Sequence, residues 1–187
     1  MVKKICIILT IPEPLNSELN DEIKELHKKY SSFCKSSHPN NGTYFDIPHI
    51  TLFSMGYCYE NKGSIEAKLR ELVRKHKPIT IKSKELTLFE FGDQCHLVVK
   101  IEKNKELQDL HNKIITELTH LAKKKEKFIL DLYNPHSSKI LYLPKEIGEK
   151  VKKDAKIKEF KFTANEIGIK VRQENHYCII EKLIKLA

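Results

Sequence analysis

A short pattern that joins a proline, a histidine and a hydroxyl residue occurs twice in this chain. The first copy is Pro48-His49-Ile50-Thr51, and the second is Pro135-His136-Ser137-Ser138. Side chains two residues apart in a β-strand project from the same face, so each copy offers an imidazole and a hydroxyl to one side. The proline favours an extended backbone before it and marks the entry into the strand. Two copies about half a chain apart indicate two similar lobes that bring the copies face to face.

Two histidines and two hydroxyls are suited to breaking a phosphodiester bond without a metal. One group must take a proton from the attacking oxygen, and another must give a proton to the departing oxygen. Imidazole suits both tasks because its pKa of ~6.5 leaves both forms populated near neutral pH. Hydroxyl groups can donate hydrogen bonds to the non-bridging phosphate oxygens. The pattern predicts His49 and His136 as the catalytic pair and Thr51 and Ser138 as phosphate-binding residues, without deciding which histidine is the base.

Other interpretations of these residues remain open. The chain has nine histidines, and we expect the other seven to be structural or exposed. A single Pro-His-x-Thr would carry little weight, whereas two copies that each enter an apolar strand favour chemistry. The first rival is a non-catalytic RNA-binding module that uses its basic charge for affinity. The second rival is metal-dependent hydrolysis by histidines and thiols.

Composition and charge indicate a globular domain with an anionic ligand. The chain has 187 residues, 40% of them hydrophobic, with a mean hydropathy of −0.45 and no apolar run long enough to span a bilayer. Its length favours one domain, which we place at residues 1–187 and expect to be a monomer. The formal charge of +9 would attract a polyanion, although lysine-rich helix faces are often only solvated surfaces.

Cysteine usage indicates a reducing compartment. The five cysteines are odd in number, scattered along the chain and without any C-x-x-C pair, so we expect free thiols in a cytoplasmic protein rather than disulfides or a zinc site. The apolar segment at residues 3–11 is followed by Pro12-Glu13-Pro14 and not by a small-residue cleavage site. It is therefore expected to be a buried strand and not a signal peptide.

Hydrophobic periodicity predicts the elements that position the two copies. The order strand, helix, motif strand is expected twice. The expected strands are residues 4–11, 45–53, 79–91, 95–101, 132–143, 159–171 and 176–186, with a turn at Gly92-Asp93-Gln94. The expected helices run from Ser17 as its cap to Tyr30, from Ser64 to Pro78, over 105–123 and over 145–155. Residues 36–42 and 54–63 are expected to be loops.

At its two motifs the sequence resembles the 2H phosphoesterase superfamily, also called the LigT-like or RNA 2′,5′-ligase and cyclic phosphodiesterase family. His49-Ile50-Thr51-Leu52 looks like the first family motif, and His136-Ser137-Ser138 looks like the second. The resemblance covers nearly the whole chain. It implies an α+β fold with two lobes, in which two antiparallel sheets flanked by helices surround a central cleft. It also implies that His49 and His136 are catalytic, that Thr51 and Ser138 hold phosphate, and that no metal or other cofactor is needed.

The resemblance further implies a substrate with a 2′-linked phosphate. Candidates are 2′,5′-oligoadenylate, a cyclic dinucleotide with a 2′,5′ bond such as 2′,3′-cGAMP, and RNA ends that carry a 2′,3′-cyclic phosphate. The first two serve as immune messengers that viral members of the superfamily destroy, which is compatible with this compact, basic chain. Nucleobases would need flat partners beside the motifs. Tyr44 and Tyr133 are the candidates for base stacking, while Lys139 and Arg172 are weaker candidates for ligand contact.

Overall fold

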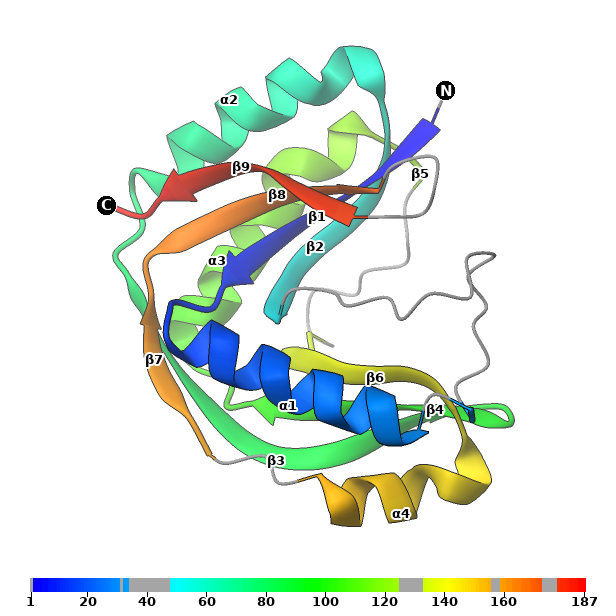
Figure 1. Ribbon diagram of the computed structural model, residues 1–187. Helices are drawn as coiled ribbons and strands as arrows, with labels where there is room; N and C mark the ends of the chain where they lie inside the picture. The colour runs from blue at the N-terminus through cyan, green and yellow to red at the C-terminus, as the bar shows by residue number, and fades with distance from the viewer. Residues whose placement is uncertain (1, 31, 34–47, 125–132, 156–158, 173–177) are drawn as a thin grey trace.

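The strands of the molecule form two antiparallel sheets (Figure 1). The computed structural model describes residues 2–30, 32–33, 48–124, 133–155, 159–172 and 178–187. In the part described, the first sheet has five strands in the order β5-β2-β1-β8-β9, and the second has four in the order β6-β4-β3-β7. The predicted α+β architecture of two antiparallel sheets with helices is confirmed.

The described strands are divided between the two sheets, and the helices lie between them in the sequence. The first sheet contains β1 (Val2–Thr10), β2 (His49–Cys58), β5 (Ala122–Lys124), β8 (Glu166–Arg172) and β9 (Cys178–Lys185). The second sheet contains β3 (Ile79–Phe91), β4 (Gln94–Ile101), β6 (His136–Pro144) and β7 (Lys161–Ala164). The helices are α1 (Leu15–Tyr30), α2 (Lys62–Val73), α3 (Lys105–Leu118) and α4 (Lys145–Asp154), with short 3-10 turns at Tyr59–Asn61 and Thr119–Leu121.

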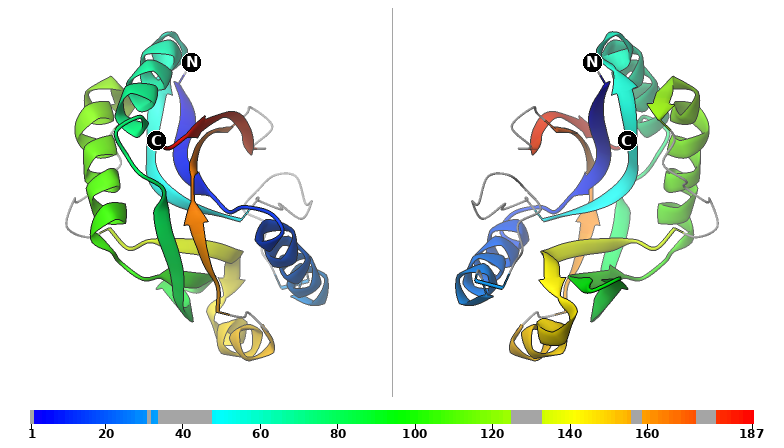
Figure 2. Two further views of the ribbon diagram at one scale, coloured as in Figure 1. Left: turned by 90° about the vertical axis from the view of Figure 1, so that its left-hand side faces the viewer. Right: turned by 90° about the vertical axis from the view of Figure 1, so that its right-hand side faces the viewer.

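The predicted repeat of strand, helix and motif strand is present, and its helices cross between the sheets. Each motif strand pairs with the strand that precedes its helix, β2 with β1 and β6 with β4. Helix α1 follows β1 of the first sheet but packs on β6 of the second, whereas α3 follows β4 of the second sheet but packs on β2 of the first. The two side views separate these layers, with α2 and α3 along one sheet and α1 and α4 along the other (Figure 2). Each motif strand is therefore backed by the helix of the other half.

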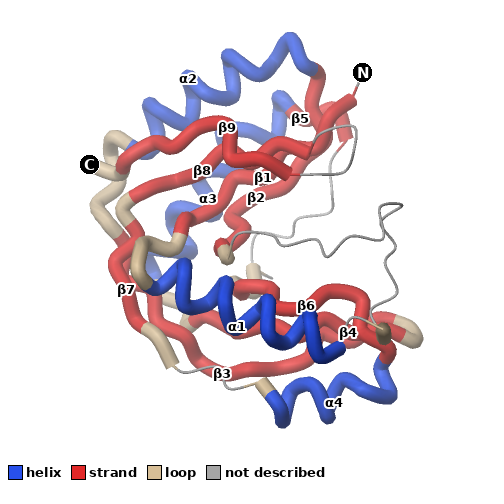
Figure 3. Tube along the Cα trace, in the orientation of Figure 1, coloured by secondary structure: helices blue, strands red, loops and turns tan. Residues whose placement is uncertain are grey.

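Two apolar clusters fill the spaces behind the sheets. The larger one joins the first sheet to α2 and α3 and extends to the first residues of β3. The smaller one lies among β4, β6, α1 and α4, and it includes Leu26, Tyr30, Leu97 and Ile140. None of the helices described is long and apolar enough to cross a bilayer. The arrangement of helices and strands is traced in Figure 3.

Several element predictions are wrong at their boundaries. Residues 54–63 are not a loop, since β2 continues to Cys58 and α2 begins at Lys62. Pairing with β1 along its full length holds this stretch extended, although the sequence has no alternation there. Helix α3 ends at Leu118 rather than residue 123, because β5 pairs with β2. Ser17 lies inside α1, where its backbone N–H and hydroxyl both donate to the Glu13 carboxylate.

Most of the other element predictions agree with the structure to within a few residues, although helix α2 ends at Val73 rather than at Pro78. The first strand, the β3–β4 hairpin and helix α4 agree closely with expectation, and Gly92 adopts a positive φ of 60° in the hairpin turn. The single strand expected over 159–171 is wrong, because Asn165 separates β7, which pairs with β3 in the second sheet, from β8, which pairs with β1 in the first. The last expected strand is confirmed as β9. The predicted loop at 36–42 lies outside the described residues.

Candidate active site

The two motifs lie where the two sheets approach each other. Strand β2 begins at His49 and strand β6 begins at His136. The two strands are in contact, and Figure 1 shows the start of β2 beside β6. In each strand the motif histidine and hydroxyl residue are partly buried, while the residue between them is fully buried. The alternation predicted from the sequence is therefore present in both copies.

The first motif is held by a bulge in β2. Ile7 pairs with Phe53 and Ile8 pairs with Thr51, so Leu52 has no partner on β1. The Leu52 carbonyl instead accepts a hydrogen bond of 2.6 Å from Nδ1 of His111, a buried residue of α3. A bulge of this kind bends the strand and re-aims the side chains beside it. His111 is therefore structural, as the sequence analysis expected.

The second motif repeats this construction. Val98 pairs with Ser138 and Leu97 pairs with Ile140, which leaves Lys139 without a partner on β4. The backbone of Lys139 is hydrogen-bonded to His27 of α1. Burial lowers the pKa of His27, an effect that this hydrogen bond opposes. In both strands the residue after the motif hydroxyl forms a bulge, and its backbone is hydrogen-bonded to a histidine of the helix that packs on that strand.

The His136 ring is oriented by two neighbours. Its Nδ1 lies 2.8 Å from the carbonyl oxygen of Asn134, and a carbonyl can only accept, so Nδ1 carries the hydrogen. In the neutral ring this leaves the lone pair on Nε2, which is the nitrogen able to take up a proton. The edge of the ring meets Phe89 of β3 at 4.9 Å between centroids and 68°. The sequence analysis did not identify Phe89 as a neighbour of His136. In the β3–β4 hairpin Phe89 pairs with His96.

His96 is a further neighbour of the second motif that the sequence did not single out. Its ring lies edge-on to Phe91 and Tyr142 at 4.5 and 4.9 Å, and its Nε2 is buried without a hydrogen-bond partner among the described residues. Burial, with a smaller effect of the charge on His136, lowers the pKa of His96 to about 4. At neutral pH the His96 ring is therefore uncharged.

Tyr133 ties the segment before β6 to the first motif. Its hydroxyl donates to the carbonyl of Thr51 at 3.0 Å, and its ring stacks on His111 at 3.8 Å and 10°. Burial raises the pKa of this hydroxyl, so it stays protonated. His111 covers one face of the Tyr133 ring, so a base could stack only on the other face. Base stacking on Tyr133 stays a prediction. Tyr44 and the side chain of Arg172 lie outside the described residues.

Lys139 occupies the face of β6 opposite Ser138 and points toward α1. It is 3% exposed, and its Nζ has no hydrogen-bond partner in the described part of the chain. Glu22 of α1 is the charge that acts on it. A direct contact between Lys139 and a ligand held by His136 and Ser138 is therefore wrong, because the side chain is enclosed behind the strand.

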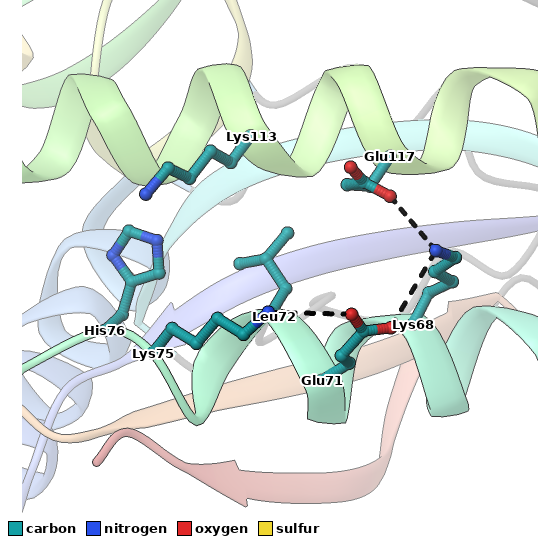
Figure 4. A pocket seen from close by; sticks show the side chains of 7 residues that line it. All are labelled: Lys68, Glu71, Leu72, Lys75, His76, Lys113 and Glu117. Carbon is teal, nitrogen blue, oxygen red and sulfur yellow. Dashed lines mark ion pairs between the residues drawn. The ribbon is translucent and has the colours of Figure 1, made fainter.

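A cavity of about 230 Å³ lies elsewhere, between α2 and α3, and involves none of the predicted site residues. Figure 4 shows Lys68 at one end between Glu71 and Glu117, with Nζ–Oε2 distances of 3.8 and 3.2 Å. His76 and Lys113 line the other end. Ion pairing between the helices accounts for most of this lining, so we do not assign it to the site.

No three histidine, cysteine, aspartate or glutamate side chains of the described residues come together as metal ligands. Cys6 and Cys95 form no disulfide within this part of the chain. Independence from metal ions stays a prediction that needs a chelator experiment.

Comparison with solved structures identifies the same fold in several proteins. Over 100% of this chain and 99% of the other, the structure matches Escherichia coli LigT complexed with 3′-AMP at a TM-score of 0.68 and 11% identity. It matches TT0787 of Thermus thermophilus at a TM-score of 0.65 and 11% identity, covering 98% and 97% of the two chains. Usb1 of Kluyveromyces marxianus matches at 0.51 and 11% identity, with 98% of each chain covered. A search of curated protein sequences found no match.

A family model gives the same answer from the sequence. The model for the 2′-5′ RNA ligase superfamily matches residues 14–176, which include both motifs and most of the chain. The fold and the duplicated, bulged motif strands agree with that match. The chain therefore belongs to the 2′-5′ RNA ligase superfamily of LigT-like 2H phosphoesterases.

Proposed function

We propose that this protein is a metal-independent, cytoplasmic phosphodiesterase that cleaves 2′-linked ribonucleotide phosphodiesters. The preferred substrates are 2′,5′-oligoadenylate or a cyclic dinucleotide with a 2′,5′ bond. His49 and His136 exchange protons with the reacting oxygens, and Thr51 and Ser138 hold the phosphate. The protein works as a monomer on a small nucleotide or an RNA end.

The chemistry follows from two imidazoles in opposite protonation states. In a 2′,5′ linkage the neighbouring 3′-hydroxyl attacks phosphorus, and one histidine removes its proton. The other histidine gives a proton to the departing 5′-oxygen, so a 2′,3′-cyclic phosphate and a free 5′-hydroxyl result. Water attacks instead when the substrate is already a cyclic phosphate. Hydrogen bonds from the two hydroxyls stabilise the charge that grows on the non-bridging oxygens.

The observation that carries this proposal is the duplicated construction of β2 and β6. Each strand presents a histidine and a hydroxyl on one face, with the following residue bulged and bonded by a helix histidine. The tautomer of His136 suits proton transfer at Nε2. Relatives of the same fold have been solved with ribonucleotides, LigT with 3′-AMP or ATP and Usb1 with uridine monophosphate, which supports a nucleotide as ligand.

A substrate panel tests the proposal. The purified protein is incubated with 2′,5′-oligoadenylate, 2′,3′-cGAMP, its all-3′,5′ isomer and a 2′,3′-cyclic mononucleotide, and the products are separated by chromatography. We expect cleavage of the 2′,5′ substrates, persistence of the 3′,5′ isomer and full activity in EDTA. Cleavage of the cyclic mononucleotide alone would favour an enzyme of RNA ends, and inhibition by EDTA would contradict independence from metal.

Histidine variants separate catalysis from binding. We expect His49→Ala and His136→Ala to lose turnover by about 10²–10⁴-fold each, while the control His120→Ala, at an exposed position, keeps it. If the wild-type protein turns over none of the panel, or if His49→Ala is as active as wild type, the enzyme proposal fails. Binding of RNA without turnover would then support the RNA-binding module.

A further inference from the structure

Behind the second motif lies a group of buried polar side chains that the proposed chemistry does not use. Ser137 and Lys139 project from the face of β6 that α1 covers, with exposures of 0% and 3%. The Ser137 hydroxyl, the Lys139 ammonium and one Glu22 carboxylate oxygen are all buried without a hydrogen-bond partner in the described structure. Three such atoms in one layer are unusual, because buried polar groups are nearly always paired.

The charge on Lys139 is only partly compensated. Burial lowers the pKa of Lys139 to about 8, against the opposing effect of Glu22. Burial also raises the pKa of the Glu22 carboxyl, and Lys139 opposes that shift. Among the described charges on α1, α4, β2 and β4, which contact β6, Glu22 is the one that acts on Lys139, and His27 binds its backbone. At neutral pH the lysine is therefore mainly protonated, with one carboxyl group near it.

The fold itself does not require a lysine at this place. The corresponding residue of the first motif is Leu52, which is also bulged, also bonded by a helix histidine and 1% exposed. The residue that corresponds to Ser137 is Ile50, with 0% exposure. Apolar side chains thus fill the same layer behind β2. A buried charge at a position where the other motif strand carries leucine, in a strand that also carries the motif side chains, points to a functional role.

We propose that Lys139 is a positioning residue of the second motif, whose buried ammonium group acts from behind β6 to strengthen the binding of phosphate at His136 and Ser138. The inference rests on the proposed function in placing phosphate at those two residues. A unit charge roughly 10 Å from a phosphate, at an effective dielectric constant of about 20, changes affinity by about tenfold. The low-dielectric layer between α1 and β6 protects this effect from screening by salt.

Calorimetric titration with inorganic phosphate and with 3′-AMP at pH 7 tests the proposal. We expect Lys139→Met to bind both ligands about tenfold more weakly than wild type. Methionine fills a similar volume, and a thermal melt verifies that the variant is folded, because the substitution removes the charge opposite Glu22. The matched control Lys68→Met removes one positive charge from the surface of α2, and its affinity should equal that of wild type.

The pH dependence of phosphate affinity is a second test, because it would not change if Lys139 were only structural. Protonated Lys139 favours phosphate, so the wild-type affinity should fall more than that of Lys139→Met as the pH rises from 7.5 to 9. Cysteine thiols also titrate in this range, but both proteins retain them. Glu22→Gln should move the decrease to lower pH, since Glu22 raises the pKa of Lys139. If protonation of Lys139 raises phosphate affinity tenfold, linkage requires that bound phosphate raises the pKa of Lys139 by about one unit. A titration followed by the NMR signal of the lysine Cε measures this change.

Two results would overturn the proposal. One is equal affinity of wild type and Lys139→Met at pH 7 with the same decrease above pH 7.5. The other is a wild-type protein that binds neither phosphate nor 3′-AMP at His136 and Ser138. Failure of the proposed function looks different, because the substrate panel would then show no turnover while the tenfold difference in phosphate affinity persists.

Discussion

Strands β2 and β6 are built alike on the face that carries the motifs and differ on the face behind. Each begins at the motif histidine, carries a hydroxyl two residues later and bulges at the next residue. Behind β2 the layer is apolar, with Ile50 and Leu52 against α3. Behind β6 it is polar, with Ser137 and Lys139 against α1. The difference teaches that the motif geometry depends on the bulge and the helix histidine rather than on one kind of packing.

Among the tests that compare the two halves by activity, the largest effect should come from removing the motif hydroxyls. These variants ask whether the two halves contribute equally to catalysis. We expect Thr51→Val and Ser138→Ala each to lower kcat/KM on a 2′,5′ substrate by about 10²-fold, because each removes one hydrogen bond to the charged phosphate. Steady-state kinetics measures the effect. The exposed Thr80→Val is the matched control and should keep full activity. An effect in only one of the two motif variants would show that the structural duplication is not a functional one.

Substitutions at Leu52 and Lys139 should change the free energy of unfolding by different amounts, because one layer is apolar and the other is polar. Leu52→Lys places an ammonium group in the apolar cluster, and we expect a loss of about 3–5 kcal/mol in the free energy of unfolding. Lys139→Met should cost less, about 1–2 kcal/mol, because removing the buried ammonium group partly offsets the loss of the charge opposite Glu22. Denaturant titrations of both variants give these values. A large loss in Lys139→Met would mean that the lysine is a structural requirement of β6.

Acid should weaken the second sheet through His96. Its folded pKa of about 4 lies below the ordinary value of 6.5, so the unfolded chain binds more protons and stability falls as the pH drops from 6.5 toward 4. From pH 7 to 4.5 this residue should account for a loss of about 2 kcal/mol. His27, His76 and His111 shift in the same direction, so the wild-type loss is larger. Denaturant titrations at both pH values should show a loss smaller by about 2 kcal/mol in His96→Phe than in wild type.

The hydroxyl of Tyr133 should contribute a smaller amount to the first motif. Tyr133→Phe keeps the stack on His111 but leaves the Thr51 carbonyl without its donor, so we expect a loss of about 1–2 kcal/mol and a Tm lower by about 2–6 °C. Tyr142→Phe is the matched control, because the Tyr142 hydroxyl makes no hydrogen bond with the described residues, and its Tm should stay within about 2 °C of wild type. Equal melting temperatures for the two variants would argue against the Tyr133 bond.

Patterns within one strand could be predicted from the sequence, whereas contacts between strands could not. The period of two placed His49 with Thr51 and His136 with Ser138, and helical periodicity located α1 to α4. The bulges at Leu52 and Lys139 depend on pairing with β1 and β4, which no local pattern encodes. Helices α1 and α3 pack on the opposite sheet, which the sequence does not show. The hydrogen bonds of His27 and His111 to the bulged residues could therefore not be predicted. The strand period predicted that Lys139 lies on the face of β6 opposite His136 and Ser138. Its burial follows from the packing of α1 on that face, which the sequence does not show.

The smallest effect should come from the ion pair between α2 and α3, which tests what holds the layer behind β2. Lys68 and Glu117 lie 3.2 Å apart, and both side chains are more than 40% exposed, so water and salt screen their attraction. A double-mutant cycle of Lys68→Ala and Glu117→Ala should give a coupling energy of about 0.2–1 kcal/mol that disappears in about 1 M salt. A coupling above about 2 kcal/mol would mean that surface charge, rather than the apolar cluster and the His111 bond, fixes α3 behind the first motif. Charged groups would then contribute behind β2 as well as behind β6, and the contrast between an apolar and a polar layer would be lost.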